Sequence, residues 1–193
     1  MCIRDSRMDK PEVVARILQA HGRGRTIIFA RTKRSAAELA EDLAQRGFTV
    51  AAVHGDLGQR AREAALDAFR RSSADILVAT DVAARGIDVE DVTHVINFQT
   101  PDDPMTYVHR IGRTGRAGKK GTAVTLVGYD EVRKWQAIND ELSLDARELP
   151  EWFSTSPELH EALDIPDSAT ARVGRPRKVL GARPARASGR NRR

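Results

Sequence analysis

Five short apolar segments, alternating with stretches of helical periodicity, are the feature of this sequence that most limits its fold. Each segment is rich in Val, Ile, Leu, Phe or Ala, mostly without polar alternation. Uninterrupted apolar strands are typical of parallel sheets that are buried on both faces. The pattern therefore predicts an α/β fold, with a parallel sheet and helices on both of its faces. The expected strands span residues 26–30, 48–53, 75–80, 93–98 and 122–127.

The intervening segments predict the covering helices. Residues 33–46 carry Ala36, Leu39 and Leu43 at helical spacing, and Gly47 follows as the expected end of that helix. In parallel sheets of this kind, ligands bind beyond the carboxyl ends of the strands. The loops that follow the strands are therefore where a functional site is expected. Further helices are expected over residues 11–20, 59–71 and 130–142.

Positive charge is concentrated at one end of the chain. The 193 residues contain 32 Lys and Arg and 27 Asp and Glu, and nine of these bases but one of the acids lie in residues 167–193. Residues 1–166 therefore hold 23 bases and 26 acids, so a polyanion would need a local basic patch there. Residues 167–193 are expected to form a basic disordered tail. Such a tail either binds phosphates non-specifically or only keeps the chain soluble.

The first six residues, Met-Cys-Ile-Arg-Asp-Ser, resemble the translation of a transposase-type sequencing adaptor joined to a gene fragment. A genuine short N-terminus is the alternative. We therefore expect four regions, which are an adaptor remnant, an α/β domain, a C-terminal helical extension and the basic tail. Their boundaries are residues 1–6, 7–128, 129–166 and 167–193.

Several classes of protein are excluded by composition. The single cysteine, Cys2, excludes an intramolecular disulfide framework and a cysteine-based zinc site. No apolar run approaches the roughly 18–20 residues of a membrane span, so no membrane partner is expected. No secretory signal is visible, and a cytoplasmic location is therefore the expectation.

Polar and glycine-rich sequences follow the expected strands. Residues 54–63 read H-G-D-L-G-Q-R-A-R-E, residues 80–88 read T-D-V-A-A-R-G-I-D, and residues 109–116 read H-R-I-G-R-T-G-R. The last of these places three arginines three residues apart. Placed on the first turn of a helix, they would share one face and form a guanidinium cluster that suits a polyphosphate. A solvated arginine-rich surface is the alternative. The three arginines are Arg110, Arg113 and Arg116.

Taken in this order, the motifs resemble the C-terminal RecA-like domain of DEAD-box RNA helicases of superfamily 2, a P-loop NTPase-type α/β fold. The resemblance covers residues 8–128 and continues more weakly as far as Pro166. Gln99 departs from the family pattern, which commonly has Asp there, and is expected to support the loop more than the chemistry. The matching segments are residues 26–32 (motif IV), 54–63, 79–88 (motif V), 95–101 and 109–116 (motif VI).

The resemblance implies an ATP site that two RecA-like domains share. Arg113 and Arg116 would act as arginine fingers on the γ-phosphate. Asp88 would accept a hydrogen bond from the ribose, with Gly86 in the same loop. Coupling between the domains is assigned to His109, Arg110 and Arg85, although Arg110 could instead be an anchor within its own domain.

The resemblance also implies contacts to the phosphates and sugars of single-stranded RNA, which position the strand without reading its sequence. The surface alternatives are an ion pair of Arg62 on its helix and a turn hydroxyl at Thr80. His54 is either a buried structural histidine or a functional one, and Asp56 and Asp81 are expected to brace loops. The residues assigned to RNA are Gly55, Gln59, Arg62 and Thr80.

Neither a G-x-x-x-x-G-K-[S/T] loop nor a D-E-A-D motif occurs in the sequence. In the family both belong to an N-terminal RecA-like domain, which would hold most of the Mg²⁺ coordination. The expected intact protein is thus an RNA-dependent ATPase and helicase with ATP, RNA and that domain as partners, and this chain alone is expected to be inactive. A non-catalytic RNA-binding or assembly module and a superfamily 2 DNA helicase are the alternatives.

Overall fold

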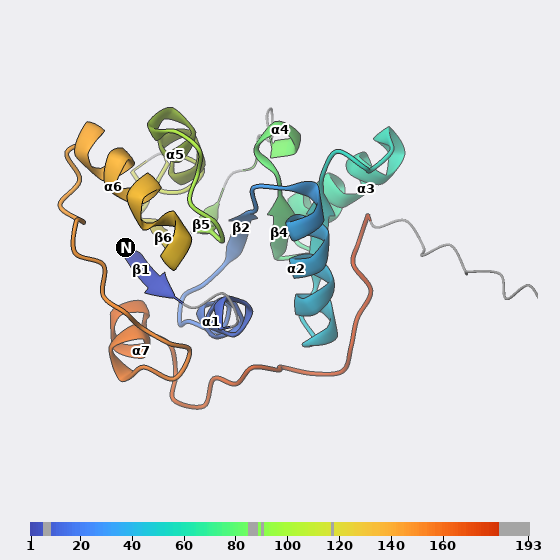
Figure 1. Ribbon diagram of the computed structural model, residues 1–193. Coiled ribbons are helices and arrows are strands. Elements are labelled where there is room, and N and C mark those ends of the chain that lie inside the picture. The colour runs from blue at the N-terminus through green and yellow to red at the C-terminus, as the bar shows by residue number, and fades with distance from the viewer. Residues whose placement is uncertain (6–8, 85–88, 90, 117, 182–193) are drawn as a thin grey trace, which may run out of the picture.

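The computed structural model describes residues 1–5, 9–84, 89, 91–116 and 118–181. Within them, six parallel strands form one sheet in the order β1-β6-β5-β2-β4-β3 (Figure 1). The five predicted strands are confirmed, with ends that differ by up to two residues. The strands are β1 (Cys2–Asp5), β2 (Arg25–Phe29), β3 (Val50–Val53), β4 (Ile76–Ala79), β5 (Val92–Asn97) and β6 (Thr122–Gly128).

Helices cover both faces of the sheet, as predicted. Alternate strand residues point to opposite faces, so Ile28 and Val78 belong to one hydrophobic cluster and Phe29 and Ala79 to another. The first face is covered by α1 (Lys10–Ile17), α2 (Lys33–Gln45) and α7 (Pro157–Leu163). The second face carries α3 (Gln59–Arg70), α4 (Asp81–Ala84), α5 (Pro104–Ile111) and, after the short helix η1 (Tyr129–Glu131), α6 (Val132–Glu141).

Helix α2 shows how local sequence sets the ends of an element. Thr32 and Ser35 form a reciprocal capping box at its start, which satisfies backbone N–H groups of the first turn. Gly47 ends it in the left-handed region at φ +97°, and the Phe48 N–H bonds to the Leu43 carbonyl. This is the Schellman arrangement, and it confirms the predicted stop at Gly47.

Residues 1–6 are expected to be an adaptor remnant, yet the first five of them take part in the fold. Strand β1 pairs in parallel with β6, from Cys2 opposite Thr125 to Asp5 opposite Gly128. Ile3 is fully buried in the core beneath α1. The pairing uses backbone groups at the open edge of β6, and such an edge accepts any extended segment. The backbone pairing itself therefore does not depend on the origin of the segment, whereas the buried Ile3 side chain fits the core.

The chain beyond Asp167 also differs from expectation. Residues 167–181, here called the C-terminal strap, run in extended form past α1 and α2 to the outer edge of β3 (Figure 1). Ala169 is buried in the core, and Leu180 bridges in parallel to Ala51. Backbone hydrogen bonds and a few buried apolar side chains hold the strap on the domain. The strap therefore stays in place without the hydrophobic periodicity of a helix or strand. Residues 182–193 lie outside the described residues.

The extension over residues 129–166 packs onto the same domain. Trp135 of α6 is fully buried, meets the Tyr107 ring edge-on at 5.4 Å and donates from Nε1 to the Ala146 carbonyl. Ser154 donates from both its N–H and its hydroxyl to Asp9, which joins the segment before α7 to the start of α1. Among the described residues, no helix combines the length and the apolar character needed to cross a membrane.

Candidate functional site

The carboxyl ends of the central strands meet at one edge of the sheet. The Phe98 N–H bonds to the Phe29 carbonyl, which joins the ends of β5 and β2. The Thr80 N–H bonds to the Val53 carbonyl at 3.3 Å, which joins the ends of β4 and β3. The loops predicted to carry function therefore leave the sheet side by side.

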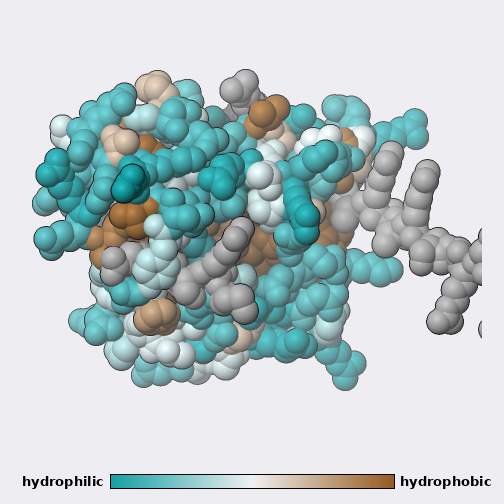
Figure 2. Space-filling view, viewed as in Figure 1, coloured by the Kyte–Doolittle hydropathy of each residue, from teal (hydrophilic) through white to brown (hydrophobic). Residues whose placement is uncertain are grey.

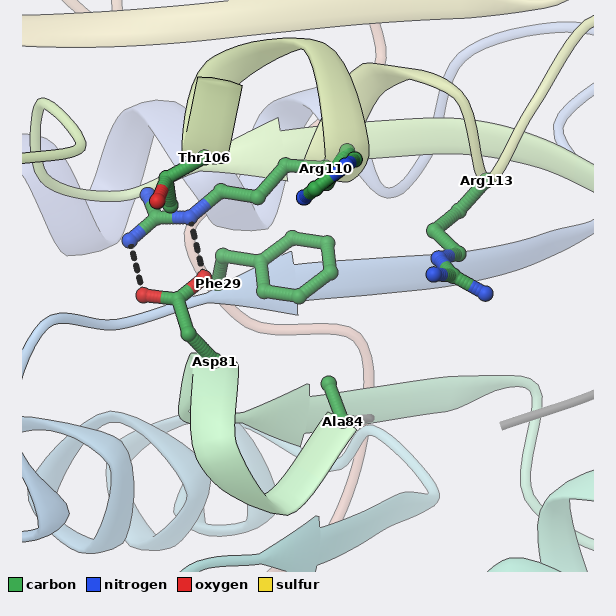
Figure 3. Close-up of a pocket in the computed structure, with 7 residues that line it drawn as sticks. Phe29, Asp81, Ala84, Thr106, Arg110 and Arg113 are labelled. Carbon is green, nitrogen blue, oxygen red and sulfur yellow. Dashed lines mark hydrogen bonds and ion pairs between the residues drawn. The ribbon is translucent and has the colours of Figure 1, made fainter. Parts of the chain in front are cut away.

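Arg110 lies at the centre of this edge and is buried, with 2% of its surface exposed. Its guanidinium binds both carboxylate oxygens of Asp81 at 2.7 Å (Figure 3). The remaining terminal nitrogen donates to Asn97 Oδ1 and to the Gln99 carbonyl, and the Phe29 ring lies 5.3 Å from the guanidinium carbon. A two-point, charge-assisted pair of this kind fixes both geometry and charge.

The prediction that the three arginines share one helical face is wrong. Helix α5 ends at Ile111, so Arg110 lies in its last turn whereas Arg113 and Arg116 lie in the turns beyond it. Arg110 points inward to Asp81, and Figure 3 shows the Arg113 side chain extending away from that pair. The helix instead starts at Pro104, which favours a first helical position, and the Asp103 side chain caps it.

The turns that carry Arg113 and Arg116 are closely fixed. The Thr114 hydroxyl donates to the Val92 carbonyl at 2.5 Å. A Cβ on Gly121 would lie 2.2 Å from that hydroxyl, so the turn is packed against the start of β6. The Arg116 Nε donates to the Gly112 carbonyl at 2.7 Å while its side chain remains exposed.

A small pocket of about 80 Å³ lies between α4 and α5 (Figure 3). Small-molecule sites usually occupy about 300–1,000 Å³, so this pocket does not enclose a nucleotide. It offers instead one wall of a larger site, with the exposed His109 and the half-buried Arg113 in its lining. The full lining is Phe29, Asp81, Ala84, Thr106, His109, Arg110 and Arg113.

The side chains at this wall suit phosphate groups. Arg113 and Arg116 bring two permanently charged donors to one end of α5, and guanidinium geometry matches phosphate oxygens. No group of three or more His, Cys, Asp or Glu side chains that could hold a metal ion is present in the described part of the chain. The guanidinium groups of Arg113 and Arg116 therefore favour an anionic ligand.

The four residues assigned to RNA lie on the loops after β3 and β4 and on the start of α3. Arg62 donates to the Ala83 carbonyl at 3.0 Å, which ties α3 to α4. The surface ion pair considered for Arg62 is not among the contacts that the structure gives this residue. Gln59 is exposed and bonds Glu63, Gly55 is exposed with open space at its Cα, and Thr80 is buried.

His54 lies beside these residues and is half-buried. Its Nδ1 is buried, and no hydrogen-bond partner for it is present among the described residues. Burial lowers the pKa of His54, the Asp56 carboxylate raises it, and the Lys33 ammonium lowers it further. Asp56 in turn pairs with Lys33 at 2.8 Å, and this hydrogen bond lowers the Asp56 pKa. The expectations that Asp56 and Asp81 brace loops agree with these contacts.

Gln99 supports the loop, as expected, through contacts that the sequence pattern did not specify. Its side-chain oxygen accepts hydrogen bonds from the Arg31 N–H at 2.9 Å and from the Ser35 hydroxyl at 3.0 Å. Its backbone carbonyl accepts from Arg110. Gln99 thus joins the loop after β2 to the buried arginine. The sequence signal for this role was the amide side chain at a position where the family commonly has a carboxylate.

A buried charged network was also missed. Lys10 donates to Glu131 at 3.3 Å and to the carbonyls of Phe98 and Leu126, and Arg31 approaches the second oxygen of Glu131 at 3.4 Å. Lys10 lies on the apolar face of α1, and a lysine at such a position predicts a buried acidic partner. Three further predicted site residues, Arg85, Gly86 and Asp88, lie outside the described residues.

The all-parallel sheet with helices on both faces matches the RecA-like fold of solved DEAD-box C-terminal domains. Residues 9–118 match the model of the helicase conserved C-terminal domain. The chain therefore belongs to this family, and its relatives place it with the DEAD-box RNA helicases.

Two curated relatives and one solved structure show the extent of the similarity. DEAD-box ATP-dependent RNA helicase RhpA of Helicobacter pylori B128 is 46% identical over 70% of this chain and 28% of its own length. CshA of Bacillus subtilis 168 is 45% identical over 80% of this chain and 30% of its own. The chain thus spans less than a third of these relatives. The E. coli DEAD-box protein SrmB, solved with regulator of ribonuclease activity A, superposes with a TM-score of 0.71 at 33% identity, covering 88% of this chain and 95% of that one.

Proposed function

We propose that this chain is the C-terminal half of an ATP-dependent RNA helicase that couples ATP binding and hydrolysis to local unwinding of RNA duplexes. It supplies Arg113 and Arg116 to ATP bound on an N-terminal RecA-like domain, which holds most of the Mg²⁺ coordination. Asp88 and Gly86 belong to the same nucleotide contact. The chain alone turns over no ATP.

The different environments of the three arginines carry this proposal. Arg110 has its charge matched by Asp81 and lies buried, so it acts as an anchor and as a link to interdomain coupling with His109 and Arg85. Arg113 and Arg116 extend from fixed turns beyond that anchor. A preorganised guanidinium costs no rearrangement when charge develops in the transition state. Arginine fingers contribute about 10³–10⁵ in rate in P-loop NTPases.

The RNA contact is proposed for the neighbouring loops. Gly55 lets a strand approach the backbone closely, and Gln59 and Arg62 present donors from the first turns of α3. Thr80 begins the loop that continues into α4. These groups lie at the same sheet edge as the arginines, so closure of a second domain over this edge affects both ligands together. A strand held in a bent form there cannot stay paired with its complement.

The test joins this chain to the N-terminal RecA-like domain of a DEAD-box relative and measures phosphate release with and without single-stranded RNA. We expect RNA-stimulated hydrolysis by the joined protein and none by the chain alone. Arg113→Ala and Arg116→Ala should each lower the rate by about 10³-fold or more while ATP binding persists. Arg133→Ala, an exposed arginine on α6, is the matched control.

Each other outcome selects a different function. Hydrolysis by the chain alone would contradict the division of the active site. Equal stimulation by DNA would favour a DNA helicase of the same superfamily. RNA binding without hydrolysis in the joined protein would favour a non-catalytic RNA-binding or assembly module.

A further inference from the structure

The C-terminal strap is attached to the domain by contacts along its whole length. Gln19, which follows α1, and the Thr170 backbone exchange two hydrogen bonds, and Arg46 donates to the Ala171 carbonyl at 3.0 Å. At its end, the Leu180 N–H donates to Val50 and its carbonyl accepts from Ala52. The strap therefore adds a single residue of β-pairing to the β3 edge.

Two close crossings fix its path. A Cβ on Gly47 would lie 2.6 Å from the Gly174 nitrogen, so the strap passes directly over the end of α2. A Cβ on Gly181 would lie 2.6 Å from the Ala65 Cβ and 3.0 Å from the Ala61 carbonyl. The last described residue is thus packed against α3, the helix that carries the candidate RNA contacts Gln59 and Arg62.

The strap carries positive charge that the rest of the domain does not neutralise. Arginines elsewhere are commonly paired, as Arg34, Arg46 and Arg70 are with acids on their own helices. The strap has a single acid, Asp167, at its start. No ion pair involves any of its four bases in the part of the chain that the structure describes, and all four are exposed. These bases are Arg172, Arg175, Arg177 and Lys178.

The arrangement of these charges favours one kind of partner. An extended backbone advances about 3.3 Å per residue, so the four bases form a line and not a compact patch. A line of cations suits a polyanionic chain whose phosphates repeat along its length. The line leads toward α3, and five more arginines follow in residues 182–193 without an acid.

We infer that the C-terminal strap is a second RNA-binding surface, which extends the RNA contact of α3 along the β3 edge. This inference rests on the proposed function. Its ligand is the phosphate backbone of RNA, bound without sequence preference. Docking of the strap matters because it fixes the line of charge from the end of α2 and the start of β3 toward α3, whereas an unattached arm would have to be ordered on binding.

The test uses the 193-residue chain and a labelled single-stranded RNA over a series of salt concentrations. The strap variant combines Arg172→Gln, Arg175→Gln and Lys178→Gln. The control variant removes the same charge far from the strap, by Arg133→Gln, Lys134→Gln and Arg147→Gln on and after α6. Each phosphate contact contributes about 0.7 to the slope of log affinity against log salt, so the strap variant should lose about 2 from that slope. The control should keep the wild-type slope.

A second variant separates docking from charge. Leu180→Pro removes the N–H donor to Val50 and blocks pairing with β3, while every base remains. We expect it to weaken RNA binding by about tenfold at low salt, with the circular dichroism of the fold unchanged. Wild-type binding by Leu180→Pro would overturn the inference that the docked strap matters.

The remaining outcomes are distinguishable. If the strap variant binds RNA like the wild type, the inference is wrong and the proposed function stands. If the strap variant instead loses binding to polyglutamate or to phosphatidylserine vesicles with RNA binding intact, the partner is a protein or a membrane and the inference is also wrong. If the wild-type chain binds no RNA at all, the proposed RNA contact itself fails.

Discussion

Asp81 and Arg110 form a two-point ion pair across the carboxyl edge of the sheet, with both N–O distances at 2.7 Å. Asp81 stands at the first turn of α4 and Arg110 in the last turn of α5, so the pair fixes two loops of the site relative to each other. The carboxylate is also favoured at a helix start, where the backbone N–H groups point toward it.

Asp81→Ala should therefore destabilise the domain. Removing one partner of a buried pair leaves an uncompensated charge and costs about 3–5 kcal/mol. Asp81 is one-third exposed, so water reaches the vacated site and about 2–3 kcal/mol is expected. Urea unfolding measures this loss. Asp56→Ala, which removes an exposed pair with Lys33, should leave the midpoint unchanged, and equal losses in both variants would contradict the assignment.

Gln99→Ala should loosen the loop after β2. The substitution removes the acceptor of the Arg31 N–H and of the Ser35 hydroxyl, and each such bond contributes about 0.5–1.5 kcal/mol. Hydrogen exchange at the Arg31 amide should become faster, while exchange in β4 stays slow. Unchanged exchange at Arg31 would show that another group holds the loop. Gln99→Asp tests whether the shorter side chain still reaches both donors.

Stability should fall as pH drops below neutrality, in part because of His94. This residue is 7% exposed, and burial followed by the charge of Arg23 lowers its pKa below the usual value of about 6.5. The unfolded chain therefore binds the proton first, and stability that is present above the unfolded pKa is lost as pH falls toward the folded one. His94→Gln should flatten the dependence of the unfolding free energy between pH 7.5 and about pH 5. A slope equal to that of the wild type would refute the role of His94.

Gly47→Ala should cost more than the same change at Gly22. Both glycines have positive φ, +97° and +68°, so alanine is strained at each by about 1 kcal/mol. A Cβ at Gly22 meets no atom within 4 Å, whereas at Gly47 it meets the Gly174 backbone at 2.6 Å. The difference between the two losses of unfolding free energy measures the cost of the steric clash between a Cβ at position 47 and the strap backbone. Equal losses would mean that the strap moves away from position 47 at no cost in stability.

Arg62→Ala should separate the RNA contact from stability. The variant loses a hydrogen bond to Ala83, which contributes about 1 kcal/mol or less at a partly exposed site. If Arg62 makes the proposed RNA contact, RNA affinity should fall by about tenfold, because a phosphate contact is lost as well. Anisotropy titration and urea unfolding on the same preparations measure both. Loss of stability with RNA binding intact would make Arg62 a purely structural tie.

Much of the fold could be predicted because it depends on local pattern. A parallel sheet buried on both faces leaves nearly continuous apolar runs, and glycine at Gly47 marks a helix end through its backbone freedom. Strand β1 could not be predicted, because edge pairing uses backbone groups that carry no sequence signal. The strap was not predicted for the same reason, since most of its hydrogen bonds are made by its own backbone N–H and C=O groups.

The location of the candidate site could be predicted from the sequence, but the orientation of its side chains could not. Motif spacing predicted a candidate site on the loops that follow the strands, and the carboxyl ends of those strands do meet at one edge of the sheet. The orientation of each arginine was not predictable, because Arg110 turns inward toward Asp81, a partner 29 residues away. Spacing along the chain says nothing of a partner on another element. The start of α5 could have been predicted from Asp103 and Pro104. Because the helix ends at Ile111, Arg110 lies in its last turn.

The bridge between Leu180 and Ala51 has a consequence for how copies of the protein behave toward one another. Strand β3 is the last strand of the sheet, and an uncovered strand of this kind pairs readily with a strand from another molecule. Leu180 occupies that edge with one residue, and the bases and Pro176 before it discourage further strand addition. A chain that ends before Val179 leaves the edge bare, and its copies should associate and precipitate at concentrations where the longer chain stays in solution.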